Sequence, residues 1–136
     1  YMERKFELNK LITYQNFAKK VKLSKNKLLK ILNKLKKENK EVIGYGATAK
    51  AVTILNYCNI NKDLISYFVD TTPEKINRFM PGKNIKIIKY NSNSLKTINY
   101  AFLGAWNFKK EISSKEKIFL KKGGKFITHI PSPKIL

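Results

Sequence analysis

Residues 41–50, EVIGYGATAK, decide the fold class of this chain. The stretch reads as a short buried strand that runs into Gly44 and Gly46 and then into a helix. Glycines at such an elbow permit a tight turn and let a ligand approach the backbone closely. A helix that begins directly after them presents unpaired N–H groups and the positive end of its dipole to an anion. The stretch therefore predicts a strand, a turn and a helix of the kind that often binds a phosphate.

Downstream of this elbow, short apolar runs alternate with helical stretches. In a helix after the glycines, one apolar face would consist of Ala47, Ala51, Ile54, Leu55 and Cys58. Strand-like runs follow in LISYFVD, NIKIIKY, INYAFLGAWN and KFITHI. We therefore predict an α/β, Rossmann-like fold, with a mostly parallel sheet of about five strands and helices on both faces.

The end of the chain carries helix and tail signals. A helix is expected over residues 108–120, with Asn107 as its N-cap and with Gly123 and Gly124 at its C-terminal stop. Two prolines after residue 130 indicate an extended tail.

Upstream of residue 40 the pattern is helical throughout. Apolar residues recur at helical spacing, namely Tyr14, Phe17, Ala18, Val21, Leu28, Ile31, Leu32 and Leu35. Lysines fall on the other faces, so the segment predicts a long amphipathic helix with a basic side. Such a helix can pack on its own domain, lie on a membrane or fill a groove of a partner. Because a folded domain follows at once, we interpret residues 1–39 as a helical connection that packs on a Rossmann-like domain formed by residues 40–136.

Charge is the most unusual bulk property of the chain. Its 136 residues are 43% hydrophobic, which suits one domain, and 29 basic against 9 acidic residues give a net charge of +20. Such a charge suggests nucleic-acid binding. However, only Arg4 and Arg78 are arginines, whereas base recognition favours the planar fork of arginine. The lysines are spread along the whole chain, so a solvated lysine coat is the preferred interpretation and nucleic acid is not the expected partner.

The sequence contains no signal for a membrane or for disulfide chemistry. No apolar run is long enough to cross a bilayer, and the first residues lack the apolar stretch of a signal peptide, so no membrane partner and a cytoplasmic location are expected. The single cysteine, Cys58, cannot form an intrachain disulfide and is expected in the core, and no metal site is expected.

The elbow has the glycine spacing of a dinucleotide-binding turn, with an alanine in place of the third glycine. The backbone amides of Ala47 and Thr48 are predicted to face a pyrophosphate. Asp70 ends the next strand, where an acidic residue usually accepts hydrogen bonds from ribose hydroxyls. A ligand should lie at the switch point between the first and fourth strands, beside Trp106 and Asn107. Alternatively, the glycines only permit close packing and Asp70 is a solvated strand end.

Five segments also occur in the order of a known family: VIGYGATAK, LNYC, VDTTPEKINRFMPGKNIKI, AWN and GGKFITHIPSP. In this order they resemble the C-terminal domain of the S-adenosylmethionine-dependent sugar C-methyltransferases. The resemblance extends from about Phe17 to the end of the chain. The best-described members of the family add a branch-point methyl group to a nucleotide-linked keto-deoxysugar, and relatives occur in O-antigen and capsule gene clusters.

The resemblance implies a division of labour between domains. In the family a cysteine-rich zinc domain and a methyltransferase domain precede a Rossmann-like domain, and the sugar nucleotide is expected between the last two. Residues 40–136 would then be the substrate-binding domain, and its partners a sugar nucleotide, such as a dTDP-linked keto-deoxysugar, and a methyltransferase domain in the same or a partner chain. This chain is expected to bind no cofactor itself, since S-adenosylmethionine and zinc belong to the absent domains.

The resemblance further implies a set of substrate-binding residues. They are Gly44, Tyr45, Gly46, Ala47, Thr48, Lys50, Asp70, Lys75, Arg78, Trp106 and Asn107, with Pro81 and Gly82 in the same loop as Arg78. No catalytic residue is expected, because His129 is the only histidine and is interpreted as structural. The chain alone is not expected to methylate a substrate, so it is a fragment of a larger enzyme or a subunit that needs a partner.

Several of these residues have an ordinary structural alternative. Lys50 and Arg78 could bind a phosphate or simply lie on the surface. Trp106 could stack on a base or sugar, or cap the core. Tyr45, between the glycines, could line the nucleotide site or lie over the sheet edge.

Two other functions stay open. A free-standing module that binds NAD or another dinucleotide for regulation or redox chemistry fits the elbow and Asp70 almost as well. A basic module whose charged helix docks on an anionic surface fits the lysines. The ligand preferred by the chain, and the salt dependence of its binding, would distinguish the three functions.

Overall fold

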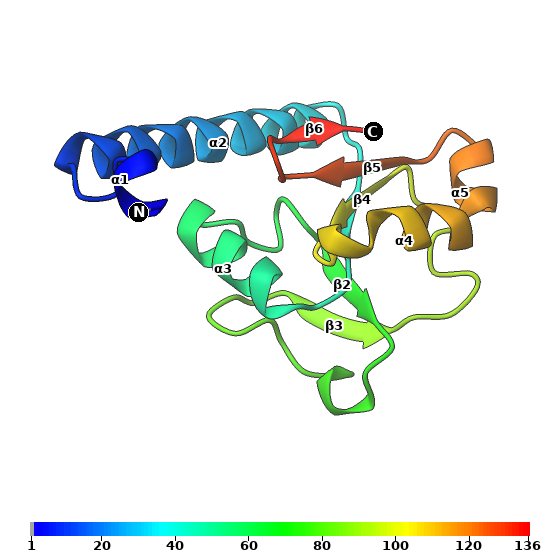
Figure 1. The fold of residues 1–136 in the computed structure, drawn as a ribbon. Coiled ribbons are helices and arrows are strands. Elements are labelled where there is room, and N and C mark those ends of the chain that lie inside the picture. Colours follow the sequence, from blue (N-terminus) through cyan, green and yellow to red (C-terminus); the bar gives the residue numbers. More distant parts are fainter. Residues whose placement is uncertain (1) are drawn as a thin grey trace.

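The computed structural model describes residues 2–136 and has one mixed sheet flanked by helices (Figure 1). In chain order the elements are α1 (Met2–Lys5), α2 (Leu11–Lys37), β1 (Val42–Tyr45), α3 (Ala49–Cys58), β2 (Tyr67–Asp70), the 3-10 turn η1 (Pro73–Lys75), β3 (Lys86–Lys89), β4 (Tyr100–Leu103), the 3-10 turn η2 (Trp106–Phe108), α4 (Lys109–Lys115), α5 (Lys117–Lys121), β5 (Lys125–Thr128) and β6 (Lys134–Ile135). The strands follow the order β3-β2-β1-β4-β5-β6. The first five are parallel, and β6 pairs with β5 in the antiparallel sense. The predicted Rossmann-like fold is confirmed, with the switch point between β1 and β4.

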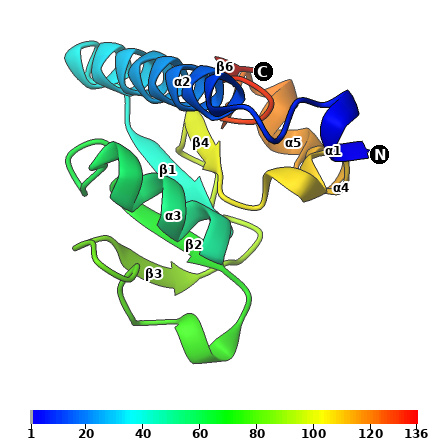
Figure 2. The same ribbon diagram turned by 60° about the vertical axis from the view of Figure 1, so that its left-hand side comes forward.

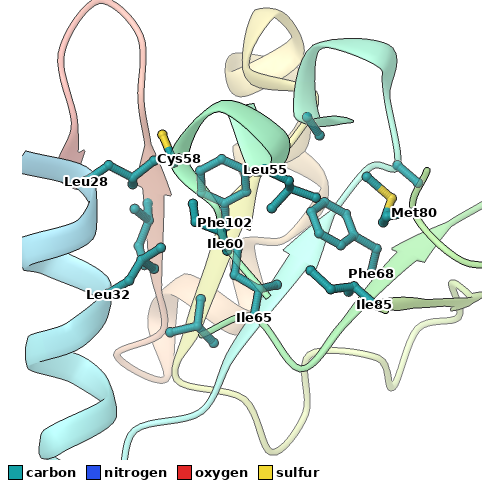
Figure 3. Close-up of a cluster of buried hydrophobic side chains, with 14 of the residues drawn as sticks. Leu28, Leu32, Leu55, Cys58, Ile60, Ile65, Phe68, Met80, Ile85 and Phe102 are labelled. Atoms are coloured by element: carbon teal, nitrogen blue, oxygen red, sulfur yellow. The ribbon is translucent and has the colours of Figure 1, made fainter. Parts of the chain in front are cut away.

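The two faces of the sheet bury separate apolar clusters because side chains alternate along each strand. In β1, Val42 packs toward α2 and α3, whereas Ile43 packs toward α4 and α5. Figure 3 shows the first cluster, in which Phe102 of β4 lies between Leu28 of α2 and Leu55 of α3, whereas Phe68 of β2 lies on the far side of Leu55, beside Met80. The second cluster includes a phenylalanine from each of α5 and β5. Helical cover on both faces explains why the parallel strands read as nearly continuous apolar runs.

The long helix α2 packs on the domain through its C-terminal half only. Leu28, Leu32 and Leu35 are at most 2% exposed, but Tyr14 and Phe17 of the same helix are 55% and 66% exposed. In Figures 1 and 2 α2 forms one side of the molecule, with α1 folded beside its first turns. No helix in residues 2–136 is long and apolar enough to cross a membrane.

The helix predicted over residues 108–120 is broken into η2, α4 and α5. The break falls at Glu116, whose backbone leaves helical geometry and whose side chain is buried. Asn107 lies within η2 and does not cap the following helix, so that prediction was wrong. The predicted glycine stop is present, since the amides of Gly123 and Gly124 donate to the carbonyls of Leu120 and Phe119.

The end of the chain is not merely an extended tail. Residues Lys134–Ile135 form β6 at the edge of the sheet, and Lys27 of α2 donates a hydrogen bond to Ser132 at 3.1 Å. The tail therefore pairs with β5 as the last strand of the sheet and contacts α2.

Candidate functional site

The elbow between β1 and α3 depends on a glycine for its backbone conformation and on a threonine for its hydrogen bonds. Gly46 has a φ of +85°, and a Cβ placed there would lie 2.9 Å from the Cβ of Ala105. The Thr48 hydroxyl accepts a hydrogen bond from the Ala51 amide at 3.2 Å and so caps α3. The same hydroxyl donates to the Gly104 carbonyl at 2.8 Å. Thr48 therefore joins the start of α3 to the end of β4, across the switch point of the sheet.

Asp70 fastens the elbow to the end of β2. Its Oδ2 atom accepts from the Ala47 amide at 2.7 Å, and its Oδ1 atom accepts from the Thr72 amide at 2.8 Å. The Nζ atom of Lys75 lies 3.7 Å from Oδ2. Burial by itself would raise the pKa of Asp70, but the hydrogen bonds from Thr72 and Ala47 and the charge of Lys75 lower that pKa below its usual value. Asp70 is therefore an ionised carboxylate that ties two loops together.

These bonds change the roles expected of the elbow amides. The Ala47 amide is taken by Asp70, and the Thr48 amide donates to the Gly46 carbonyl at 3.0 Å, so neither faces a phosphate in this structure. Within residues 2–136 no acceptor meets the amides of Ala49 and Lys50 in the first turn of α3. Each oxygen of Asp70 has already accepted one amide and retains capacity for a second donor such as a ribose hydroxyl.

A hollow of about 390 Å³ lies beside the elbow, at the carboxyl ends of β1, β2 and β4. It brings together five of the residues predicted from sequence, Tyr45, Gly46, Thr48, Asp70 and Lys75. The volume is within the range of small-molecule sites. This hollow is where the strand order of an open α/β sheet places a ligand.

A second hollow, of about 660 Å³, lies on the other side of the first turns of α3. The predicted residues Ala47, Thr48, Lys75 and Arg78 line it, together with Pro81 from the loop before β3. Thr48 and Lys75 line both hollows. The elbow is therefore a ridge between two concave surfaces, with Lys75 reaching both.

Five predicted residues lie outside both hollows, among them Gly82 of the loop that carries Arg78. Gly44 packs against the ring of Phe68, which leaves no room for a side chain, so it serves packing. The Lys50 Nζ atom lies 5.8 Å from the centre of the Trp106 ring and 3.4 Å from Oδ1 of Asn107. Lys50, Trp106 and Asn107 therefore form a separate cluster beside the elbow.

The first hollow is also lined by Tyr90 and Lys115, which the sequence reasoning missed. The hydroxyls of Tyr45 and Tyr90 both donate to Oε1 of Glu116, at 2.8 Å and 2.6 Å. Burial, with the bonds to Glu116, raises the pKa of Tyr90 to about 12 and also raises that of Tyr45. The Lys115 Nζ atom lies 3.8 Å from the centre of the Tyr90 ring. Tyr90 follows directly after the strand KIIK. Its place at the carboxyl end of a parallel strand is the signal by which the sequence could have identified it as a site residue.

His129 lies in the core and faces neither hollow. Its side chain is 3% exposed and stacks on Phe102, with ring centres 5.3 Å apart. Burial lowers the pKa of His129 to about 4, so the ring is neutral near neutral pH. Cys58 is 4% exposed, in the apolar core between α3 and α2. Among residues 2–136, no three His, Cys, Asp or Glu side chains are grouped as a metal ion would require.

Two comparisons with known proteins agree with this architecture. A family model described as C-methyltransferase C-terminal domain matches residues 1–131. The chain is also 32% identical over 123 residues to the C-methyltransferase NovU of Streptomyces niveus. That alignment covers 90% of this chain and 29% of the relative, so the chain spans less than a third of the relative's length. These matches confirm the resemblance seen in the sequence, and the chain belongs to the C-methyltransferase C-terminal domain family.

Proposed function

We propose that this domain binds the nucleoside diphosphate part of a sugar nucleotide and presents the sugar to a methyltransferase domain that carries S-adenosylmethionine. The observation that supports this most is the hollow beside the elbow, at the β1/β4 switch point of a C-methyltransferase C-terminal domain. The contribution of the chain is positioning, which lowers the entropic cost of bringing a sugar carbon to a methyl donor.

The lining of the hollow suits a phosphorylated ligand. Lys75 and Lys115 supply positive charge in a lining that also contains Asp70 and Glu111, and the free amides at the start of α3 lie next to the elbow. Phosphate oxygens form strong hydrogen bonds with such cations and amides. Tyr90 and Phe108 add aromatic surface on which a base or a sugar can stack. Lys75 is the residue through which we expect most of the phosphate selectivity to act.

Calorimetric titration at moderate salt tests the proposal. The probes are dTDP, UDP and GDP, with NAD, S-adenosylmethionine and a short DNA duplex beside them. We expect saturable binding of a nucleoside diphosphate that weakens roughly tenfold in Lys75→Ala, as for the loss of one charge-assisted hydrogen bond. The matched control is Lys62→Ala, since Lys62 is an exposed lysine that lines neither hollow.

Other ligand preferences would contradict the proposal in distinct ways. Preferential binding of NAD would identify a free-standing dinucleotide module. Binding of DNA alone, falling steeply with salt, would identify a basic polyanion module. Equal weakening by Lys75→Ala and Lys62→Ala would show that net charge, and not the hollow, attracts the nucleotide.

A further inference from the structure

The apolar stripe of α2 is covered at one end and open at the other. Leu28, Leu32 and Leu35 fill the core, and Val21 is half-buried. Spacings of three and four residues continue the stripe toward the N-terminus through Tyr14 and Phe17. The open stripe, defined as Leu11, Tyr14, Phe17 and Ala18, is exposed along its whole length. A fully exposed continuation of a core-facing stripe is typical of an interaction surface.

The open stripe belongs to an ordered part of the chain. The Tyr14 hydroxyl donates to the Leu8 carbonyl at 2.6 Å, and the Thr13 hydroxyl donates to the Glu7 carbonyl at 2.8 Å. These bonds tie the segment after α1 to the first turns of α2. Figure 2 shows that segment running from α1 into α2. In Figure 1 this end of α2 extends away from the sheet, so the domain itself does not cover it.

The charge around the open stripe selects the kind of partner. Helix α2 contains no acidic residue, and its lysines begin at Lys19 and Lys20, directly after the open stripe. A second copy of this chain, which carries a net charge of +20, would bring the same lysines against them. A surface with an apolar centre and carboxylates around it would instead complement both the stripe and the lysines.

The comparison with the relative indicates that a domain of this family is accompanied by further chain. The region matched by this chain is 29% of the relative, and the matching family is defined as a C-terminal domain of C-methyltransferases. We infer that the open stripe docks on the methyltransferase domain that works with this chain, at an apolar surface rimmed by carboxylates. The contact would orient the two domains so that the hollow beside the elbow faces the methyl donor. The inference rests on the exposure and charge of α2 and does not require a particular nucleotide in that hollow.

Phe17 is the expected anchor of this contact. It is a large aromatic side chain at the centre of the open stripe, 66% exposed, and burial of such a ring commonly dominates an interface. Leu23 is a matched control because it is 68% exposed on the same helix but lies off the stripe. The flanking lysines would chiefly set the association rate and its dependence on salt.

Thiol labelling provides a direct test of where the partner lies. The native thiol of Cys58 is buried, so one introduced cysteine is the main reactive group. Ala18→Cys places a thiol on the open stripe, and Asn16→Cys places one on a different face of the same exposed turn. Reaction rates with a disulfide reagent are compared for the 136-residue chain and for its assembly with the methyltransferase domain, in one polypeptide or two.

We expect both thiols to react rapidly in the chain alone. In the assembly, the rate at position 18 should fall at least tenfold while the rate at position 16 stays unchanged. Phe17→Asp should restore the rapid reaction at position 18, whereas Leu23→Asp should not. Both aspartate variants should keep the far-ultraviolet circular dichroism of the parent, since neither position contributes to the core.

Three results would overturn the inference. The first is an unchanged rate at position 18, or equal protection at positions 16 and 18, in the assembly. The second is a dimer of the chain alone that Phe17→Asp dissociates in sedimentation equilibrium, which would make a second copy the occupant. The third is protection of position 18 by vesicles of phosphatidylcholine and phosphatidylglycerol but not by the methyltransferase domain. Titration of dTDP into the Phe17→Asp chain separates this test from that of the nucleotide site, because that binding should be unaffected.

Discussion

Among single residues, Asp70 connects two of the loops that line the candidate site. Its two oxygens receive amides from two loops, that of Ala47 at the elbow and that of Thr72 after β2. A carboxylate that accepts backbone amides keeps its charge and holds both loops at fixed distances. The walls of the first hollow therefore depend on this one side chain.

Asp70→Asn should destabilise the fold by roughly 1–3 kcal/mol, because an amide nitrogen would replace one acceptor and face an N–H group. The measurement is urea unfolding near neutral pH, with Asp63→Asn at an exposed turn as the control. The folded-state pKa of Asp70 is depressed, so its contribution is present above the unfolded-state pKa and is lost as pH falls through the folded-state pKa. A variant as stable as the parent would show that these amide bonds contribute little.

His129 makes a prediction about pH. Its pKa falls from 6.5 to about 4 on folding, so between these values the unfolded chain binds a proton that the folded chain does not. Stability should therefore decrease as pH falls below 6.5, by roughly 3 kcal/mol when pH 4 is reached. Urea unfolding at several pH values measures this slope.

The control for this prediction is His129→Phe, which keeps an aromatic ring against Phe102. Because His129 is the only histidine, no other side chain of that type titrates in this interval. The variant should lose most of the slope between pH 5 and 6.5. Retention of the full slope would assign it to other groups.

At the level of elements, the break between α4 and α5 coincides with one buried carboxylate. Glu116 is 8% exposed and accepts the hydroxyls of Tyr45 and Tyr90, which come from β1 and from the end of β3. A continuous helix would have to bring this side chain to the two tyrosine hydroxyls while keeping regular backbone geometry. In the structure the backbone instead departs from helical ψ at Glu116. Helical periodicity in the sequence contains no information about tyrosines that arrive from other strands.

Glu116→Leu should lower the free energy of unfolding by roughly 2–4 kcal/mol, because it leaves two tyrosine hydroxyls without their acceptor. Glu116→Gln keeps an acceptor oxygen and should cost less than about 1 kcal/mol. Urea unfolding of the two variants measures the difference. If both cost the same, the charge of Glu116 and not its hydrogen bonding would be the stabilising feature.

For the whole molecule, the net charge of +20 acts against the compact state. The described salt bridges are few and lie between Lys10 and Glu7, Lys34 and Glu38, and Lys75 and Asp70. Most lysines therefore repel one another across the surface, and salt should screen this repulsion.

The melting temperature should rise by roughly a few degrees when sodium chloride is increased from about 20 mM to about 500 mM. Lys30→Glu, at an exposed position of α2, should raise the melting temperature at low salt and have a smaller effect at high salt. Differential scanning calorimetry measures both effects. An unchanged melting temperature would show that the lysines are too far apart to repel one another appreciably.

The sequence by itself determined the α/β class, the parallel strands, the elbow after β1 and the family. These depend on local signals, namely the apolar periodicity and the glycines at the turn, and on the order of the segments. Five residues predicted for the site do meet in the first hollow, because strand order alone brings the carboxyl ends of β1 and β2 together.

Only the tertiary structure decided which groups of the elbow are free, where the later helix breaks and which half of α2 is covered. The Ala47 amide meets Asp70, and Glu116 meets Tyr45 and Tyr90, across long stretches of chain. The C-terminal half of α2 is buried by side chains from α3 and the sheet. Phe17 continues the same helical spacing of apolar residues but has no such neighbour. Hydrogen-bond partners and burial depend on which distant residues come together, and local periodicity does not contain that information.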